Sequence, residues 1–157
     1  MNSLLAVDLG IRTGLALYGQ TGRLRWYRSK NFGSRERLRR GVRGLLADIP
    51  DLAWIVVEGD RSLAEIWEQA ARGRQVPVRQ VSAEQWRRRL LHRREQSSGP
   101  RAKQSAGEMA LRIIEWSGAP HATSLRHDAA EAILIGLYGV LDVGWLARMP
   151  PQVSTAS

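Results

Sequence analysis

The amino-acid sequence predicts an α/β domain with a mixed five-stranded sheet, in which three antiparallel strands precede parallel strands and helices cover both faces. Three observations support this class. The chain begins with three short apolar segments separated by glycine-bearing turns, which is typical of an antiparallel meander. Strand-like and helix-like segments then alternate. The last helix-like segment, residues 127–142, is apolar nearly all round, as expected for a helix packed on a sheet.

The meander occupies the first 30 residues. We expect strands over residues 3–9, 13–19 and 23–30, joined by short turns. In the third of these, Leu24 and Trp26 alternate with Arg25 and Tyr27, which is the period of an antiparallel strand. Ser34 can then cap a helix that ends before Pro50.

The middle of the chain continues the sheet. The continuous apolar run over residues 53–58 predicts a central strand that is covered on both faces. A helix over about 63–72 and a further strand over 76–81 follow. Ser82 and Gln85 then form a capping-box pattern, which predicts a helix that reaches about His92.

The last third lacks strand signals. Residues 93–104 have no periodicity and contain Gly99-Pro100, so we expect a basic, mobile loop there. Helices over roughly 102–117 and 127–142 complete a single domain, which we place at residues 1–147. Residues 148–157 carry no fold signal and are expected to form a disordered C-terminal tail.

The charge balance indicates a polyanionic partner. The 157 residues include 24 Lys and Arg against 15 Asp and Glu, a net charge of +9. Arginine supplies most of the excess, and its planar guanidinium suits phosphate groups. An arginine-rich proteome would produce the same excess without such a partner. The absence of cysteine excludes disulfides and thiolate metal sites, and no apolar run has the length of a membrane span, so we expect a cytoplasmic protein with no membrane partner.

Four acidic residues interrupt or border segments that otherwise belong in the core. Asp8 and Glu58 each follow directly on an apolar strand. Asp128 and Glu131 are three residues apart and therefore share one face of the last helix. A buried carboxylate costs several kcal/mol, to order of magnitude, unless it is paired, protonated or metal-bound. Hard oxygen ligands without cysteine favour Mg²⁺, with Mn²⁺ expected to substitute, and these acids suffice for two ions.

Taken singly, each acid has a structural interpretation. Asp8 and Glu58 could be turn residues at strand ends. Asp128 could be a helix N-cap, with Glu131 at N3 completing a capping box. The combination of two strand ends with one helix face, all beside apolar runs, favours the metal site.

The stretches around these acids resemble the RuvC-type Holliday junction resolvases of the RNase H-like, or retroviral integrase-like, superfamily. The matching stretches are LLAVDLGIRTGLALYG, WIVVEG, EQAARGRQVPVRQVS and HDAAEAILIGLYG, which with their connections span roughly residues 3–142. The last stretch is the most specific. The first also looks like the phosphate hairpin of sugar kinases and actin-like ATPases, whose folds need two such halves and a longer chain.

The resemblance implies an RNase H-like fold and a set of site residues. It places the metal-binding catalytic acids at Asp8, Glu58, Asp128 and Glu131. It adds His127 beside the metal shell or scissile phosphate, and Lys103 as a phosphate contact; the alternatives are an exposed helix-start residue and a solvated charge. The implied nucleic-acid-binding residues are Arg87, Arg88, Arg89, Arg93, Arg94, Arg101 and Lys103.

The chain also departs from the resolvase pattern. The segment from Glu58 to Gly73 is shorter and lacks the aromatic wedge that bacterial resolvases offer to the junction. Trp67 or Trp86 could stack on a base, although a Trp at helical spacing is more often in the core. Glu131 stands where Asp is common.

The resemblance implies a Mg²⁺-dependent endonuclease that cleaves four-way (Holliday) DNA junctions in recombination and repair and leaves a 5′-phosphate and a 3′-hydroxyl. It further implies a homodimer and a branch-migration helicase as partner. Two alternatives stay open. One is a YqgF-like nuclease that acts on structured RNA in ribosomal RNA maturation, because the first motif fits that group too. The other is a non-catalytic nucleic-acid-binding module that has kept the fold.

Overall fold

A five-stranded mixed sheet forms the centre of the molecule, in the computed structural model that describes residues 1–154. The spatial order of the strands is β3-β2-β1-β4-β5. β1, β2 and β3 are antiparallel neighbours, whereas β4 runs parallel to β1 and β5 parallel to β4. The predicted mixed sheet is confirmed. The strands are β1 (Ser3–Asp8), β2 (Arg12–Gly19), β3 (Leu24–Asn31), β4 (Leu52–Glu58) and β5 (Val78–Val81).

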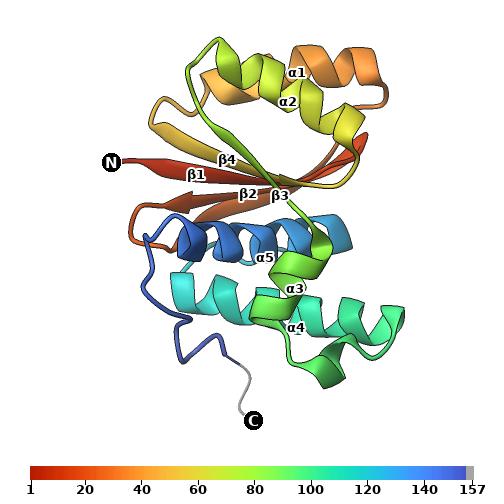
Figure 1. The fold of residues 1–157 in the computed structure, drawn as a ribbon, viewed down its shortest axis with the longest axis vertical. Helices are drawn as coiled ribbons and strands as arrows, with labels where there is room; N and C mark the ends of the chain where they lie inside the picture. Colours follow the sequence, from red (N-terminus) through yellow and green to blue (C-terminus); the bar gives the residue numbers. More distant parts are fainter. Residues whose placement is uncertain (155–157) are drawn as a thin grey trace.

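Helices cover both faces of the sheet, as predicted (Figure 1). α1 (Arg35–Ala47) and α2 (Arg61–Arg72) lie on one face. On the other face α5 (His127–Asp142) packs directly on the strands, and α4 (Gly99–Ser117) lies behind it. α3 (Ala83–Leu90) and the short 3₁₀ helix η1 (Arg93–Gln96) belong to this second layer. Among the described residues, no helix combines the length and the apolar character that a bilayer span requires.

The sheet separates two apolar cores according to the period of its strands. Leu5 and Val7 of β1 contribute to the core beneath α1 and α2. Leu4 and Ala6 contribute to the core around α4 and α5. Because successive side chains of a strand point to opposite faces, the even-numbered residues of β1 face α5. The same holds for Val56 of β4.

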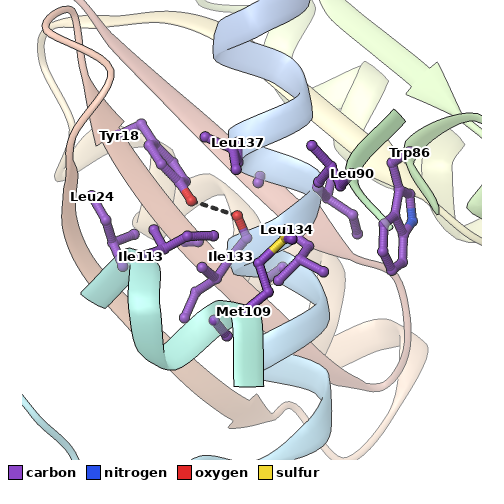
Figure 2. Packing of buried hydrophobic residues seen from close by; sticks show 14 of the residues in the cluster. Tyr18, Leu24, Trp86, Leu90, Met109, Ile113, Ile133, Leu134 and Leu137 are labelled. Atoms are coloured by element: carbon purple, nitrogen blue, oxygen red, sulfur yellow. Dashed lines mark hydrogen bonds between the residues drawn. The ribbon is translucent and has the colours of Figure 1, made fainter. Parts of the chain in front are cut away.

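α5 is held against the sheet by a buried hydrogen bond and by a close approach at a glycine. Figure 2 shows the Tyr18 side chain of β2 directed at α5, where its hydroxyl donates to the Ile133 carbonyl oxygen. A Cβ at Gly136 would lie 2.2 Å from the Tyr18 ring, so a larger residue would push the helix away. Tyr18 and Ile133 are fully buried. This packing fixes the position of the helix that carries two of the four acids.

The structure corrects one local expectation and decides two alternatives that the sequence left open. The expected loop over 93–104 is instead η1 followed by the start of α4, because the Ser98 hydroxyl caps α4 and Pro100 occupies its first turn. The N-cap of α5 is Arg126, so Asp128 is not the cap and does not form a capping box with Glu131. Trp67 and Trp86 are buried, 0% and 1% exposed, and cannot stack on a base without leaving the core.

Part of the segment expected to be a disordered tail is packed against the domain. Val153 is fully buried in the core around α4 and α5. The Arg112 side chain of α4 donates from Nε to the Val153 carbonyl oxygen at 2.9 Å. The expectation for residues 155–157 lies outside the described residues.

Candidate active site

Asp8 and Glu58 lie side by side at the ends of the two central strands. Each is the last residue of its strand, and the two are directly paired in the parallel register of β1 and β4. Both occupy even-numbered positions of their strands, as do the residues of β1 and β4 that face α5. The fold therefore turns two carboxylates that are fifty residues apart in sequence toward the same side of the sheet.

The first turns of α5 bring Asp128 and Glu131 to the same edge of the sheet. Gly14 pairs with Asp8 across β1 and β2, and a Cβ at Gly14 would lie only 1.9 Å from the Asp128 carbonyl oxygen. The helix thus begins in backbone contact with the strand beside Asp8. Glu131, one turn further along, is only 7% exposed. Its burial shows that this face of α5 points inward.

The four carboxylates share one electrostatic environment. Burial is the largest cause that raises the pKa of Asp8 to about 8; the negative charges of Glu131, Glu58 and Asp128 contribute, while Arg87 opposes them. The pKa of Glu58 is raised by burial and by Glu131. Burial also raises the pKa of Glu131, against the cations Arg87 and Lys103. Asp8 is therefore mostly protonated at neutral pH, unless a cation is added to the cluster.

The two acids of α5, Asp128 and Glu131, are held by contacts within the protein. Glu131 Oε1 accepts from Arg87 Nη2 at 3.4 Å, and His127 Nε2 lies 3.1 Å from the same oxygen. Asp128 Oδ2 accepts from the Ser29 hydroxyl at 2.8 Å, and its Oδ1 accepts from the Ala129 N–H at 2.8 Å. Within residues 1–154, no three Asp, Glu or His side chains are arranged as a ready-made metal cage. The acids share a region, and chelation would require side-chain rotation.

The donor set nevertheless fits a hard divalent cation. Every candidate ligand is a carboxylate oxygen, which is the chemistry that Mg²⁺ and Mn²⁺ prefer. Burial raises the pKa of Asp8 and of Glu131, and the nearby cations Arg87 and Lys103 offset this only in part. Asp8, Glu58, Asp128 and Glu131 are the residues that would hold the ions.

The raised pKa of Asp8 predicts that Mg²⁺ affinity depends on pH. A proton must leave Asp8 before it binds the ion, so the apparent affinity should rise up to about tenfold per pH unit from pH 6, and level off above about pH 8. Calorimetry in buffers of different ionisation enthalpy measures both the affinity and the protons released. Glu65→Gln, an exposed acid of α2, is the control and should leave the profile unchanged. A flat profile between pH 6 and 9 would contradict the prediction.

The two auxiliary residues named from the sequence lie near the acids. His127 is the first residue of α5 and contacts Glu131. Its pKa is lowered by burial and by the charge of Lys103, which favours the neutral imidazole. Lys103 lies on α4 and is exposed. Its charge acts on both His127 and Glu131, which places it at the margin of the cluster.

The expected nucleic-acid-binding arginines have different surroundings. Arg87 of α3 reaches Glu131 and belongs to the acidic cluster itself. Arg88 pairs with Glu84 one helical turn away, and Arg89 is exposed on the same helix. Arg93 and Arg94 join Arg88 and Leu91 in lining an open cavity of about 980 Å³ between α3 and η1. Arg101 is exposed in the first turn of α4.

Sequence reasoning missed four residues at this site. Ser29 of β3 holds Asp128, and Gly14 admits α5 to the strand. Arg12 and Arg126 line a cavity with His127 and Asp128. Gly14 had a detectable signal, because the strand pairing of the first hairpin sets it opposite Asp8. The others depend on packing between elements that are distant in sequence.

The fold is that of RuvC. A Thermus thermophilus RuvC structure in complex with a Holliday junction substrate is 19% identical to this chain, with a TM-score of 0.65, covering 92% of this chain and 96% of that one. A second Thermus thermophilus RuvC structure is 18% identical, with a TM-score of 0.64, covering 90% and 96%. No family model matches the sequence, and no curated protein matches it. The architecture is therefore the RNase H-like fold of these RuvC structures, shared over nearly the whole length of both chains.

Proposed function

We propose that the protein is a Mg²⁺-dependent endonuclease that cleaves four-way DNA junctions. The observation that carries the proposal is the convergence of four carboxylates from β1, β4 and α5, where burial together with the other three acids raises the pKa of Asp8 to about 8. Structural frameworks seldom retain so unfavourable a cluster without a function. The net charge of +9 supports a polyanionic substrate. The fold shared with RuvC, solved with a Holliday junction substrate, supports branched DNA as that substrate.

Each residue of the cluster has a role in this proposal. Asp8, Glu58, Asp128 and Glu131 would hold Mg²⁺, which when bound supplies Lewis acidity and lowers the pKa of a coordinated water. Arg87 and Lys103 offset negative charge where the scissile phosphate approaches the acids. His127 contacts Glu131 through Nε2 at 3.1 Å and so restricts the orientation of that carboxylate. Ser29 does the same for Asp128.

The test is cleavage of labelled nucleic acids by the purified protein with Mg²⁺. The substrates are a synthetic four-way junction, a linear duplex of the same sequence and a structured RNA. We expect nicks at the junction that leave 5′-phosphates, and no cleavage of the linear duplex. Mapping the products on denaturing gels locates the cuts.

The other outcomes overturn the proposal in distinct ways. Cleavage of the RNA but not the junction would make the protein an RNA nuclease. Binding to the junction without cleavage, and without Mg²⁺ uptake by calorimetry, would make it a binding module. No interaction with any of these substrates would exclude both a nuclease and a nucleic-acid-binding module.

The proposal includes a homodimer, because symmetric resolution of a four-way junction needs two active sites. The mass of the protein in solution, measured by light scattering with and without junction DNA, tests this part. A species of two chains on one junction is expected. A single chain bound to each junction at saturation would contradict it.

A further inference from the structure

A second cationic site borders the acids, and none of the Arg and Lys residues expected to bind nucleic acid belongs to it. Arg12, Arg126, His127 and Asp128 line an open cavity of about 440 Å³. Arg12 begins β2, and Arg126 directly precedes α5. Two arginines from segments more than a hundred residues apart thus meet at one wall of the candidate active site.

Neither guanidinium is engaged by the described part of the protein. Both side chains are exposed. Across residues 1–154, neither Arg12 nor Arg126 makes an ion pair or a side-chain hydrogen bond, whereas Arg87 and Arg88 each pair with a glutamate. Asp128, the acid that shares the cavity, is already occupied by Ser29 and by the Ala129 N–H. The ten N–H donors of the two arginines, five on each by the chemistry of the group, therefore remain available to a ligand.

The cavity and the Arg87 cation lie on different flanks of the acids. Arg12 is on β2 and Ser29 on β3, the strand pair at one edge of the sheet. Arg87 reaches Glu131 from α3, which follows β5 at the other edge. A nucleic-acid strand that crosses the acids would thus meet positive charge on both sides. Adjacent phosphates of a strand are about 6–7 Å apart, so a strand at the acids offers a neighbouring phosphate to the cavity.

We propose that Arg12 and Arg126 together bind one backbone phosphate of the nucleic-acid strand next to the phosphate being cleaved. This inference rests on the proposed function and adds a ligand site to it. Guanidinium groups bind phosphate oxygens bidentately, and such contacts fix the register of a strand without reading its sequence. By binding the neighbouring phosphate, the site would keep the scissile phosphate over the acids. It would therefore contribute both to the affinity for the strand and to its position.

The experiment compares junction binding by matched variants in an Asp8→Asn background, with EDTA present so that no cleavage occurs. Arg12→Gln/Arg126→Gln removes the site. Arg72→Gln/Arg148→Gln removes the same charge from exposed positions at the end of α2 and beyond the end of α5, remote from the acids. Arg12→Lys/Arg126→Lys keeps the charge but loses the planar fork. Fluorescence anisotropy over a range of salt concentrations gives the affinity and its salt dependence, and thermal melting confirms that each variant is folded.

We expect the Gln pair to weaken binding by about 5- to 50-fold near 100 mM salt and to reduce the slope of log K against log salt by about 1, the value for one lost phosphate contact. The Lys pair should recover part of the affinity, and the Arg72/Arg148 control should keep the slope. Phosphate ethylation should identify one phosphate near the cut whose modification weakens binding only when Arg12 and Arg126 are present. Equal affinities, slopes and ethylation patterns for the Gln pair and the control would overturn the inference. Failure of the Asp8→Asn protein with both native arginines to bind any branched nucleic acid would instead overturn the proposed function.

Discussion

Replacing Asp8 by Asn is expected to abolish Mg²⁺-dependent junction cleavage while stabilising the metal-free protein. Asp8 is the carboxyl group whose pKa the other three acids raise. The amide of Asn is a poor ligand for a divalent cation. We expect the cleavage rate to fall by about 1,000-fold or more, which corresponds to roughly 4 kcal/mol of transition-state stabilisation. Single-turnover cleavage of the labelled junction measures this loss.

The gain in stability follows from the direction of the pKa shift. Burial and the neighbouring acids raise the pKa of Asp8 from 3.8 to about 8 in the folded protein. The folded state therefore holds a proton that the unfolded state has lost, and stability falls as pH rises from about 4 through about 8. Asn carries no charge, so the variant lacks this loss. Its free energy of unfolding without metal should exceed that of the native protein by about 1–3 kcal/mol at pH 8–9 and by much less near pH 4.

The control for both effects is Glu65→Gln, an exposed acid on the opposite face of the sheet. It should change neither cleavage nor the pH dependence of urea unfolding. Retained cleavage by Asp8→Asn would remove Asp8 from the reaction. A metal-free variant that is less stable than the native protein at pH 9 would show that Asp8 is a structural carboxylate with satisfied hydrogen bonds.

Gly14→Ala is expected to impair the site without touching any carboxylate. The added Cβ would lie 1.9 Å from the Asp128 carbonyl oxygen and 2.4 Å from its carbonyl carbon. Real Cβ contacts essentially never fall below 3.0 Å, and both partners are backbone, so α5 and β2 must separate by about 1 Å. A displacement of that size at a catalytic centre costs on the order of 100-fold in rate. We also expect a loss of about 1–3 kcal/mol in stability from overpacking.

The matched control is Gly44→Ala in α1, where an added Cβ meets nothing within 4 Å. This change should leave cleavage intact and stabilise the helix by about 0.5–1 kcal/mol. Mg²⁺ affinity by calorimetry should fall for Gly14→Ala and stay constant for Gly44→Ala. A folded Gly14→Ala protein with native affinity and native cleavage would show that the start of α5 does not set the geometry of the acids.

The fold was predictable because its signals are local. Short stretches were enough to predict several elements. The alternation of the first strands, the apolar run over residues 53–58 and the capping box at Ser82 are examples. The placement of Asp8 beside Glu58 was predictable for the same reason, since each ends an apolar strand and parallel strands end at one edge of a sheet; their role as metal ligands stays a prediction. The interpretation of Asp128 as the N-cap is wrong, because Arg126 occupies the N-cap position and α5 begins at His127.

The remaining features of the site depend on tertiary contacts that no short stretch encodes. Ser29 is an ordinary polar residue of an edge strand until α5 places Asp128 beside it. Arg12 and Arg126 become neighbours only when β2 and α5 pack together. The tail was read as disordered from its composition, yet Val153 is fully buried in the core around α4 and α5.

The central claim is that Asp8, Glu58, Asp128 and Glu131 form one divalent-cation site. Anomalous diffraction from crystals soaked in Mn²⁺ tests it most directly, because the scattering locates the ion regardless of activity. We predict anomalous density among these four carboxylates, with Glu131 turned away from His127 and Arg87 toward the ion. Mn²⁺ bound only elsewhere, or absent from this cluster at millimolar concentration and pH 8, would contradict the account.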